Sequence, residues 1–182
     1  MVSLRTVGHG TLAADELTAV LAGAGVEVVV DVRSFPASRR HPHFRREAME
    51  VWLPDGGIAY RWEPRLGGRR RPRPDSPHGA LRVPAFRGYA DHMETAEFRD
   101  AVDDLLADAG TRSAAVMCAE SVWWRCHRRL LSDAAVLLHG AEVEHLFHDG
   151  RLDPHRPTAE ARVDGQRLVY DGGEPGLPLR GP

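Results

Sequence analysis

Apolar runs alternate with segments of helical periodicity along most of the chain. Five strands are predicted at short apolar runs bounded by glycine or polar residues, at 4–7, 26–32, 58–62, 114–118 and 143–147. Helices are predicted where apolar residues recur every three or four positions, at 12–22, 44–53, 96–109 and 130–138. Because strands and helices alternate, the pattern predicts an α/β fold with a mostly parallel sheet and right-handed crossovers.

The remaining segments complete this architecture. The residues 64–84 are rich in arginine, glycine and proline and lack periodicity, so we expect a long functional loop over the sheet rim. The segment 161–170 predicts a β-hairpin around Asp164 and Gly165. We therefore expect one domain over residues 1–172, with a five-stranded sheet flanked by helices and a C-terminal hairpin, followed by a flexible tail over 173–182.

Composition excludes several kinds of chemistry and of location. The net charge is only −2, so no global field attracts nucleic acid or membrane. All 24 basic residues are arginines, which rules out a Schiff-base lysine and a phosphate-loop lysine. Two cysteines do not form a disulfide framework, and the chain shows no secretory signal and no membrane-spanning run. These features predict a cytoplasmic protein with reduced thiols and no membrane contact.

Polar clusters follow four of the predicted strands. His9 follows the first strand, Asp31 and Arg33 end the second, and an arginine-rich loop follows the third. The fourth cluster holds both cysteines, and its members are Cys118, Glu120, Cys126 and His127. Because the carboxyl ends of parallel strands meet at one edge of a sheet, we expect these side chains to share a single concave pocket.

The fourth cluster offers a nucleophile and proton-transfer groups. Cys126 is the candidate nucleophile, since the N-terminus of the next helix lowers a thiol pKa, and we expect it to be partly exposed; the alternative is a structural cysteine. Cys118 ends an apolar strand and is expected to be buried. Glu120 is either a general base or a clamp for an arginine, and if buried it needs Arg33 or Arg128 as a partner. His127 is either an acid/base residue or a helix-surface histidine.

Other groups near the rim have binding roles and structural alternatives. The arginines of 65–73 either bind an anion or form a solvated basic loop. Trp123 and Trp124 either stack on a base or pack on the core. Asp31 and Arg33 are also compatible with a buried structural ion pair. The cysteine spacing does not match that of metal sites, so we expect neither a metal nor another cofactor.

Five motifs of the chain resemble those of the domain of unknown function 488 family. In chain order they are Thr6-Val-Gly-His-Gly, the segment 30–40, Leu66-Gly-Gly-Arg, Phe86-Arg-Gly-Tyr-Ala, and Met117-Cys-Ala-Glu with Cys-His-Arg at 126–128. The resemblance extends from about Arg5 to Tyr170 and implies an α/β fold. Gly10 departs from the serine or threonine that is usual in the family, so no catalytic hydroxyl is implied there.

Two functions from different classes fit these residues. The first is an enzyme that acts on a phosphate-bearing or nucleotide-like small molecule, and the second is a nucleic-acid-binding or DNA-repair-associated module. The near-neutral charge favours the first, with an anionic small molecule as partner. The candidate catalytic residues are Cys126, Glu120, His127 and His9, and the candidate substrate-binding residues are Asp31, Arg33, Arg69, Arg87, Tyr89, Cys118 and Arg128.

Overall fold

The computed structural model describes residues 1–173 and confirms the α/β fold. Its six-stranded sheet has the order β3-β2-β4-β1-β5-β6. The strands are β1 (Ser3–Gly8), β2 (Val28–Asp31), β3 (Ala59–Trp62), β4 (Ala114–Cys118), β5 (Glu142–Leu146) and β6 (Leu152–Pro154). The five predicted strands are parallel, whereas β6 pairs antiparallel with β5. With three residues, β6 is too short to show a periodicity, which is why the pattern of the sequence did not predict it.

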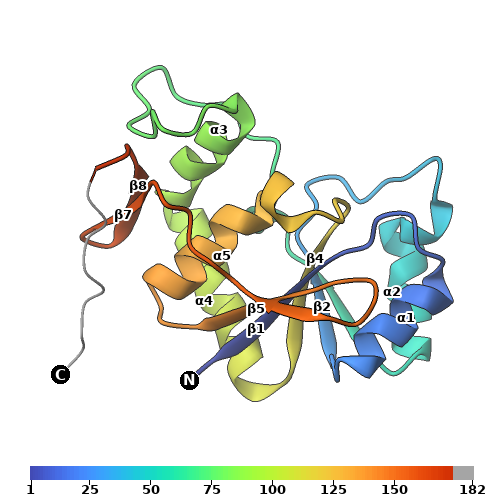
Figure 1. Ribbon diagram of the computed structural model, residues 1–182. Coiled ribbons are helices and arrows are strands. Elements are labelled where there is room, and N and C mark those ends of the chain that lie inside the picture. Colours follow the sequence, from blue (N-terminus) through green and yellow to red (C-terminus); the bar gives the residue numbers. More distant parts are fainter. Residues whose placement is uncertain (174–182) are drawn as a thin grey trace.

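Helices cover both faces of the sheet (Figure 1). On one face lie α1 (Ala14–Gly23) and α2 (Arg46–Asp55), and on the other lie α3 (Pro84–Met93), α4 (Ala96–Thr111) and α5 (Arg128–Leu137). Short 3-10 turns occur at η1 (Pro42–Phe44), η2 (Pro64–Leu66) and η3 (Trp123–Arg125). Thr95 caps α4, because its hydroxyl accepts a hydrogen bond from the backbone N–H of Phe98 at 3.2 Å.

The central strands separate two apolar cores. Along β2, Val28 and Val30 pack against the helices α3–α5, whereas Val29 packs against α1 and α2. In β4 the same alternation places Val116 in the first core and Met117 in the second. Their side chains are completely buried, as expected for a parallel sheet that is covered on both faces.

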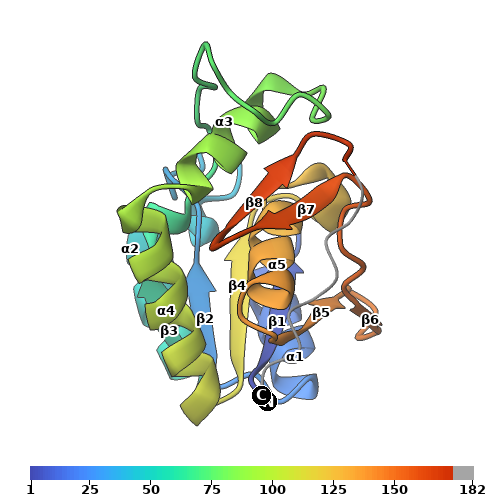
Figure 2. The ribbon, with the colours of Figure 1, turned by 90° about the vertical axis from the view of Figure 1, so that its left-hand side faces the viewer.

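The predicted hairpin forms beside the sheet and not within it. Its strands are β7 (Ala161–Asp164) and β8 (Arg167–Tyr170), and Gly165 occupies the turn with a φ of 63°. Figure 2 shows the hairpin next to α3 and above α5. Except for Gly173, the predicted flexible tail, 173–182, lies outside the described residues. Within the described part of the chain, every helix is too short or too polar to cross a bilayer.

The order of the strands brings the predicted polar clusters together. The strands β2, β4 and β1 are neighbours, and their carboxyl ends point towards the end of the sheet on which α3 lies (Figure 2). Backbone hydrogen bonds continue past the strand ends, from His9 N–H to the Cys118 carbonyl (2.9 Å) and from Val32 N–H to the Met117 carbonyl (2.9 Å). The segments after these three strands are therefore held side by side.

Candidate functional site

A cavity of about 300 Å³ lies at the carboxyl ends of β2 and β4. Its walls come from the segments after these strands, from the loop at 68–69 and from the first turn of α3. Six predicted site residues line it: Arg33, Arg69, Cys118, Glu120, Cys126 and His127. Four others do not reach its surface, namely His9, Asp31, Tyr89 and Arg128, and all four are buried. Arg87 lies on α3 and does not line the cavity.

The two cysteines face each other at the cavity wall. Their Sγ atoms are 2.8 Å apart, and both thiols are free. The pKa of Cys126 is well below its ordinary value, because the Cys118 thiol donates a hydrogen bond to it and His127 and Arg128 lie beside it. The pKa of Cys118 is well above its ordinary value, because burial disfavours a second negative charge and Cys118 keeps the shared proton. These opposite shifts favour a pair that shares one proton, with the proton on Cys118 and the thiolate on Cys126.

Arg128 is the positive charge that accompanies this thiolate. It is only 1% exposed, and no carboxylate of the described residues lies within 4.0 Å of its guanidinium group. Its NH2 group donates to the Glu120 backbone carbonyl and its NH1 group to Thr6 Oγ1 at 3.4 Å. Burial opposes its charge, but the sulfur atoms of Cys118 and Cys126 outweigh that effect, so that the pKa of Arg128 is raised. A buried cation needs an anion, and the cysteine pair supplies it.

Cys126 lies at the N-terminal end of α5, as predicted. Its backbone is extended, with φ −120° and ψ 154°, and its carbonyl accepts a hydrogen bond from Arg129 N–H in the first helical turn. The positive end of the helix dipole is therefore next to the thiolate. The predicted partial exposure of Cys126 is wrong, since only 6% of the residue is exposed. The cause is the contact with Cys118, which turns the sulfur towards the strand and away from solvent.

His127 is placed between the thiolate and the arginine loop. Its Nδ1 atom is 3.5 Å from Cys126 Sγ, and its Nε2 atom is buried without a hydrogen-bond partner. Gly68 packs against the ring so closely that a Cβ atom at this position would be 2.9 Å from His127 Nδ1. Glycine is therefore required for the loop to approach the histidine. The contact fixes His127 beside Cys126.

The prediction for a buried Glu120 is wrong. Glu120 is exposed at the cavity mouth, and among the described residues its carboxylate pairs with no arginine. Its Oε1 atom instead accepts a hydrogen bond from Val122 N–H at 3.0 Å. The cause lies in the backbone, because Arg128 donates to the Glu120 carbonyl and the side chain then points outward. Glu120 therefore reaches solvent and can act as a base at the mouth.

Asp31 and Arg33 form the buried ion pair that the sequence left as an alternative. Arg33 donates from Nε to Oδ1 at 2.8 Å and from NH2 to Oδ2 at 2.6 Å, and Asp31 is completely buried. Tyr60 donates a third hydrogen bond to Asp31 at 2.7 Å. The remaining Arg33 nitrogen, NH1, is 3.2 Å from His9 Nε2. These contacts hold Arg33 rigidly in the cavity wall.

His9 supports Arg33 from beneath the cavity. Its Nδ1 atom is 2.9 Å from the Gly10 carbonyl, so the proton lies on Nδ1 and Nε2 accepts from Arg33. The ring stacks on Phe44 with 3.8 Å between ring centroids. Burial and the positive charge of Arg33 lower the pKa of His9 to about 4, so the ring is neutral at pH 7. His9 thus positions the arginine, and the structure does not bring it to the cavity surface.

A buried hydrogen-bonded chain that the sequence did not reveal runs from Arg128 through the sheet. Thr6 Oγ1 is 2.7 Å from His145 Nδ1, and His145 Nε2 is 2.9 Å from His155 Nδ1. His155 Nε2 is 2.8 Å from Asp133 Oδ1 on α5. We call Thr6, His145, His155 and Asp133 the buried chain. His145 shares a strand face with Val143, so a polar residue at an inward position of β5 was the signal for it.

The hydrogen bonds of the buried chain can all run in one direction. The distances allow Thr6 to donate to His145 Nδ1, His145 Nε2 to donate to His155 Nδ1, and His155 Nε2 to donate to Asp133. Arg128 then donates to Thr6, so Thr6, His145 and His155 each donate one hydrogen bond and accept one, between the donor Arg128 and the acceptor Asp133. Burial and the neighbouring His155 lower the pKa of His145 to about 3, which agrees with a neutral ring. The chain therefore orients the guanidinium group that faces the cysteines.

We expect two of the buried histidines, His9 and His145, to make the fold sensitive to acid. Both pKa values are lower in the folded state than the ordinary 6.5, at about 4 for His9 and about 3 for His145. This stabilisation is complete above pH 6.5 and is lost as the pH falls towards the folded values. Each histidine should lower the free energy of unfolding by about 1.4 kcal/mol per pH unit in this range. Urea denaturation at a series of pH values measures the slope of the free energy of unfolding against pH. The His9→Gln variant lacks one titrating group, so its slope should be smaller by about 1.4 kcal/mol per pH unit. An equal slope in the variant would contradict the prediction.

The arginine loop is mostly occupied by internal contacts. Arg65 pairs with Glu63 and Asp104, both at 2.7 Å, and Arg73 pairs with Glu94 at 2.7 Å. The Tyr89 hydroxyl donates to the Leu66 carbonyl at 2.9 Å, which fixes the start of the loop. Tyr89 thus has a supporting position beneath the site.

Arg69 and Arg125 are the cations at the cavity that have no carboxylate partner among the described residues. Arg69 has a φ of 59°, a left-handed conformation that is unfavourable for an arginine, and it is exposed. Its guanidinium carbon lies 6.0 Å from the centroid of the Phe35 ring, which is also exposed at the rim. Strained residues of this kind concentrate at binding sites.

The two tryptophans have different environments. The Trp123 ring stacks on His145 with 3.9 Å between centroids and an angle of 10°, so it packs on the buried chain. Trp124 is 49% exposed. Only Trp124 therefore offers a free aromatic surface, and the two rings do not form a joint stacking platform.

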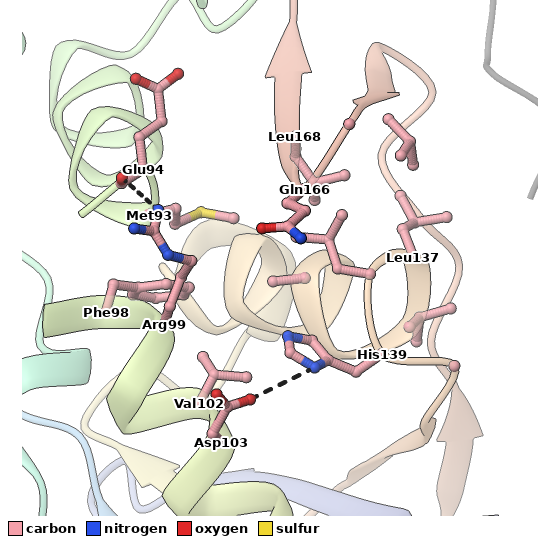
Figure 3. A pocket seen from close by; sticks show the side chains of 16 residues that line it. Met93, Glu94, Phe98, Arg99, Val102, Asp103, Leu137, His139, Gln166 and Leu168 are labelled. Atoms are coloured by element: carbon pink, nitrogen blue, oxygen red, sulfur yellow. Dashed lines mark hydrogen bonds and ion pairs between the residues drawn. The ribbon is translucent and has the colours of Figure 1, made fainter. Parts of the chain in front are cut away.

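A larger cavity, of about 620 Å³, lies between α4, the end of α5 and the hairpin (Figure 3). Its floor is apolar, with Phe98, Val102 and Leu168 among the lining residues. Figure 3 shows its polar groups paired with each other, Arg99 with the Glu94 carbonyl at 2.8 Å and His139 with Asp103 at 3.8 Å. Because it contains no nucleophile, we place the candidate site in the smaller cavity. In the described part of the chain, no group of three acidic, histidine or cysteine side chains is arranged to hold a metal ion.

The comparisons with known proteins identify the family. The family model described as domain of unknown function DUF488 matches residues 13–135, which is most of the chain and includes both cysteines. Neither a curated protein nor a solved structure matches the chain. The matched segment contains every residue that lines the smaller cavity, from Arg33 to His127. The chain therefore belongs to the DUF488 family.

Proposed function

We propose that the protein is an enzyme that acts on a phosphate-bearing or nucleotide-like small molecule through the thiolate of Cys126. The observation that carries this proposal is the close contact of the two cysteine sulfur atoms, 2.8 Å apart, next to a fully buried arginine, Arg128, whose charge favours a thiolate. A structural cysteine needs no such counter-charge. Keeping an ionised sulfur at a cavity wall supports a nucleophilic role.

The cavity provides complementary groups for an anion and for a flat apolar ring. Arg69 and Arg125 lie at its surface without carboxylate partners in the described chain, so their guanidinium groups are available for phosphate oxygens. Phe35 and Phe86 supply the apolar part of the lining. A volume of about 300 Å³ suits a small metabolite and excludes a large one.

The neighbouring residues can complete a group-transfer reaction. Cys126 Sγ would form a bond to the electrophilic atom of the substrate, and the bond from that atom to the leaving oxygen would break. His127, with Nδ1 at 3.5 Å from the sulfur, would give its proton to the leaving oxygen. Glu120, which is exposed at the mouth, would then take a proton from the water that releases the transferred group and restores the thiolate.

An activity screen tests the proposal. Purified protein would be incubated with nucleoside monophosphates and aryl phosphates, and release of the leaving group would be measured for the parent chain and for Cys126→Ser. We expect turnover that the substitution abolishes, while thermal denaturation shows that the variant remains folded. Equal turnover by both proteins would exclude Cys126 as the nucleophile.

Replacing Arg69 by glycine should weaken anion binding and stabilise the fold. Glycine adopts a φ of 59° without strain, so we expect the free energy of unfolding to rise by about 1 kcal/mol. Loss of a charged hydrogen bond should lower the affinity for inorganic phosphate or a nucleotide about tenfold. Calorimetric titration and urea denaturation measure the two effects. The exposed Arg156 provides the control, because Arg156→Gly removes the same charge away from the cavity. Unchanged affinity in Arg69→Gly would reject the anion-binding role.

The alternative of a nucleic-acid interface has weaker support. Such an interface needs unpaired arginines along a groove and free aromatic rings for the bases. Here Arg65 and Arg73 pair with acidic residues, and Trp123 stacks on His145. Arg69 and Arg125, which have no carboxylate partner among the described residues, both line the small cavity, which favours a small ligand.

A further inference from the structure

The two sulfur atoms at the cavity wall form an arrangement that suits a second reaction. Cys118 and Cys126 are the only cysteines of the chain, and their Sγ atoms lie 2.8 Å apart. Both line the cavity, and the lowered pKa of Cys126 favours a thiolate there, in contact with the Cys118 thiol. A reactive thiolate next to a second thiol is the arrangement in which oxidation at one sulfur is resolved by the other.

We propose that Cys118 and Cys126 form a reversible disulfide when the protein meets hydrogen peroxide, and that Arg128 makes the reduced state the favoured one. This inference concerns the sulfur atoms alone and does not depend on the substrate of the proposed enzyme. A small oxidant fits the geometry, because Cys126 is 6% exposed and is reached only through the cavity.

The reaction balances in two steps. In the first, the Cys126 thiolate attacks one peroxide oxygen, the O–O bond breaks, and hydroxide leaves, which gives a sulfenic acid on Cys126. In the second, the Cys118 sulfur attacks the Cys126 sulfur, the S–O bond breaks, and the hydroxyl group leaves as water with the thiol proton. Two sulfur atoms are each oxidised by one electron, and one peroxide is reduced. Two molecules of a small thiol, such as glutathione, would return the pair to its starting state.

Arg128 shifts the equilibrium between the reduced cysteine pair and the disulfide towards the reduced pair. In the reduced protein the thiolate is the anion that neutralises the buried guanidinium group. A disulfide has no charge, so oxidation leaves Arg128 buried without an anion among the described residues, which is costly. The oxidised form is therefore destabilised relative to the reduced form, and the disulfide should be readily reduced by small thiols. This favours a transient disulfide over a structural one.

Mass spectrometry of the whole protein tests the proposal without any substitution. After brief treatment with a few equivalents of hydrogen peroxide, we expect the protein to lose the mass of two hydrogen atoms and both alkylatable thiols. Excess reduced glutathione should restore both. A protein that instead gains oxygen atoms, or that keeps both thiols, would overturn the proposal.

Two variants separate the steps and the role of Arg128. In Cys118→Ser the sulfenic acid of Cys126 cannot be resolved, so a dimedone adduct should accumulate, whereas the parent chain should give almost none. In Arg128→Met the glutathione equilibrium should shift towards the disulfide by roughly tenfold or more, because no cation is stranded by oxidation. Arg129→Met, on the same helix, removes a charge that pairs with Glu160 and should leave the equilibrium unchanged. A shift of equal size in both arginine variants would refute the role of Arg128.

Discussion

Replacing Asp31 by asparagine is expected to lower the free energy of unfolding by about 3–5 kcal/mol. The Asp31 carboxylate is completely buried, and it accepts two hydrogen bonds from the Arg33 side chain and one from Tyr60. The substitution removes the only carboxylate that pairs with Arg33 among the described residues. Since Arg33 is itself buried, its charge would be left in the protein interior without compensation.

Urea denaturation measures this effect against a matched surface pair. Arg151 and Asp153 form an ion pair of the same short length, 2.6 Å, but both side chains are about half exposed. Solvent compensates the loss of such a pair, so Asp153→Asn should leave the stability unchanged. Equal stabilities for the two variants would show that the Asp31 pair contributes no more than a surface contact.

Replacing Arg128 by methionine should slow the alkylation of Cys126 at pH 7 about tenfold. An ordinary thiol with a pKa near 8.5 is only about 3% ionised at this pH, whereas the Cys126 thiol has a pKa well below its ordinary value. Removing the guanidinium group should raise that pKa, because the thiolate loses its cation. The measurement uses the Cys118→Ser background, in which Cys126 is the single thiol. The rate of iodoacetamide addition is recorded against pH with and without the additional Arg128→Met substitution.

The pH profile is the decisive part of this measurement. With Arg128 present the rate should vary little between pH 6 and 8, and without it the rate should rise steeply over the same range. Arg129→Met in the same Cys118→Ser background should keep the flat profile, since Arg129 contacts Thr158 and Glu160 and not the cysteines. Parallel profiles for all three proteins would exclude Arg128 as the counter-ion of the thiolate.

The parallel sheet could be predicted from sequence because its determinants are local. Unbroken valines and glycine boundaries each identify an element over a few residues, and the predicted elements were confirmed within a few positions. The position of the cavity followed from one rule, that parallel strands end at a common edge. The strand β6 was missed because a strand of three residues has no pattern, and its partner β5 is adjacent only in space.

Side-chain partners at the site could not be predicted in the same way. Glu120 was expected to have Arg33 or Arg128 as a partner if it was buried, but Arg128 donates to the Glu120 backbone carbonyl and the carboxylate is exposed. The pairing of Cys126 with Cys118 was missed because it depends on where α5 begins relative to the end of β4, which is a matter of a few ångströms. In the buried chain, the hydrogen-bonded partners Thr6 and His145 are 139 positions apart in the sequence, and only the assembled sheet brings them together.

The buried chain also bears on which part of this protein forms a folding unit. The carboxylate of Asp133 is completely buried, and its partners are His155, the backbone N–H of Thr158 and the Tyr170 hydroxyl. All three follow residue 135, at which the match to the family model ends. A fragment limited to that match would keep both cysteines and Arg128 but would leave Asp133 charged and unpaired next to the core. In this chain, the segment that defines the family is therefore smaller than the segment that has to fold, because β5 and the hairpin supply the partners of Asp133.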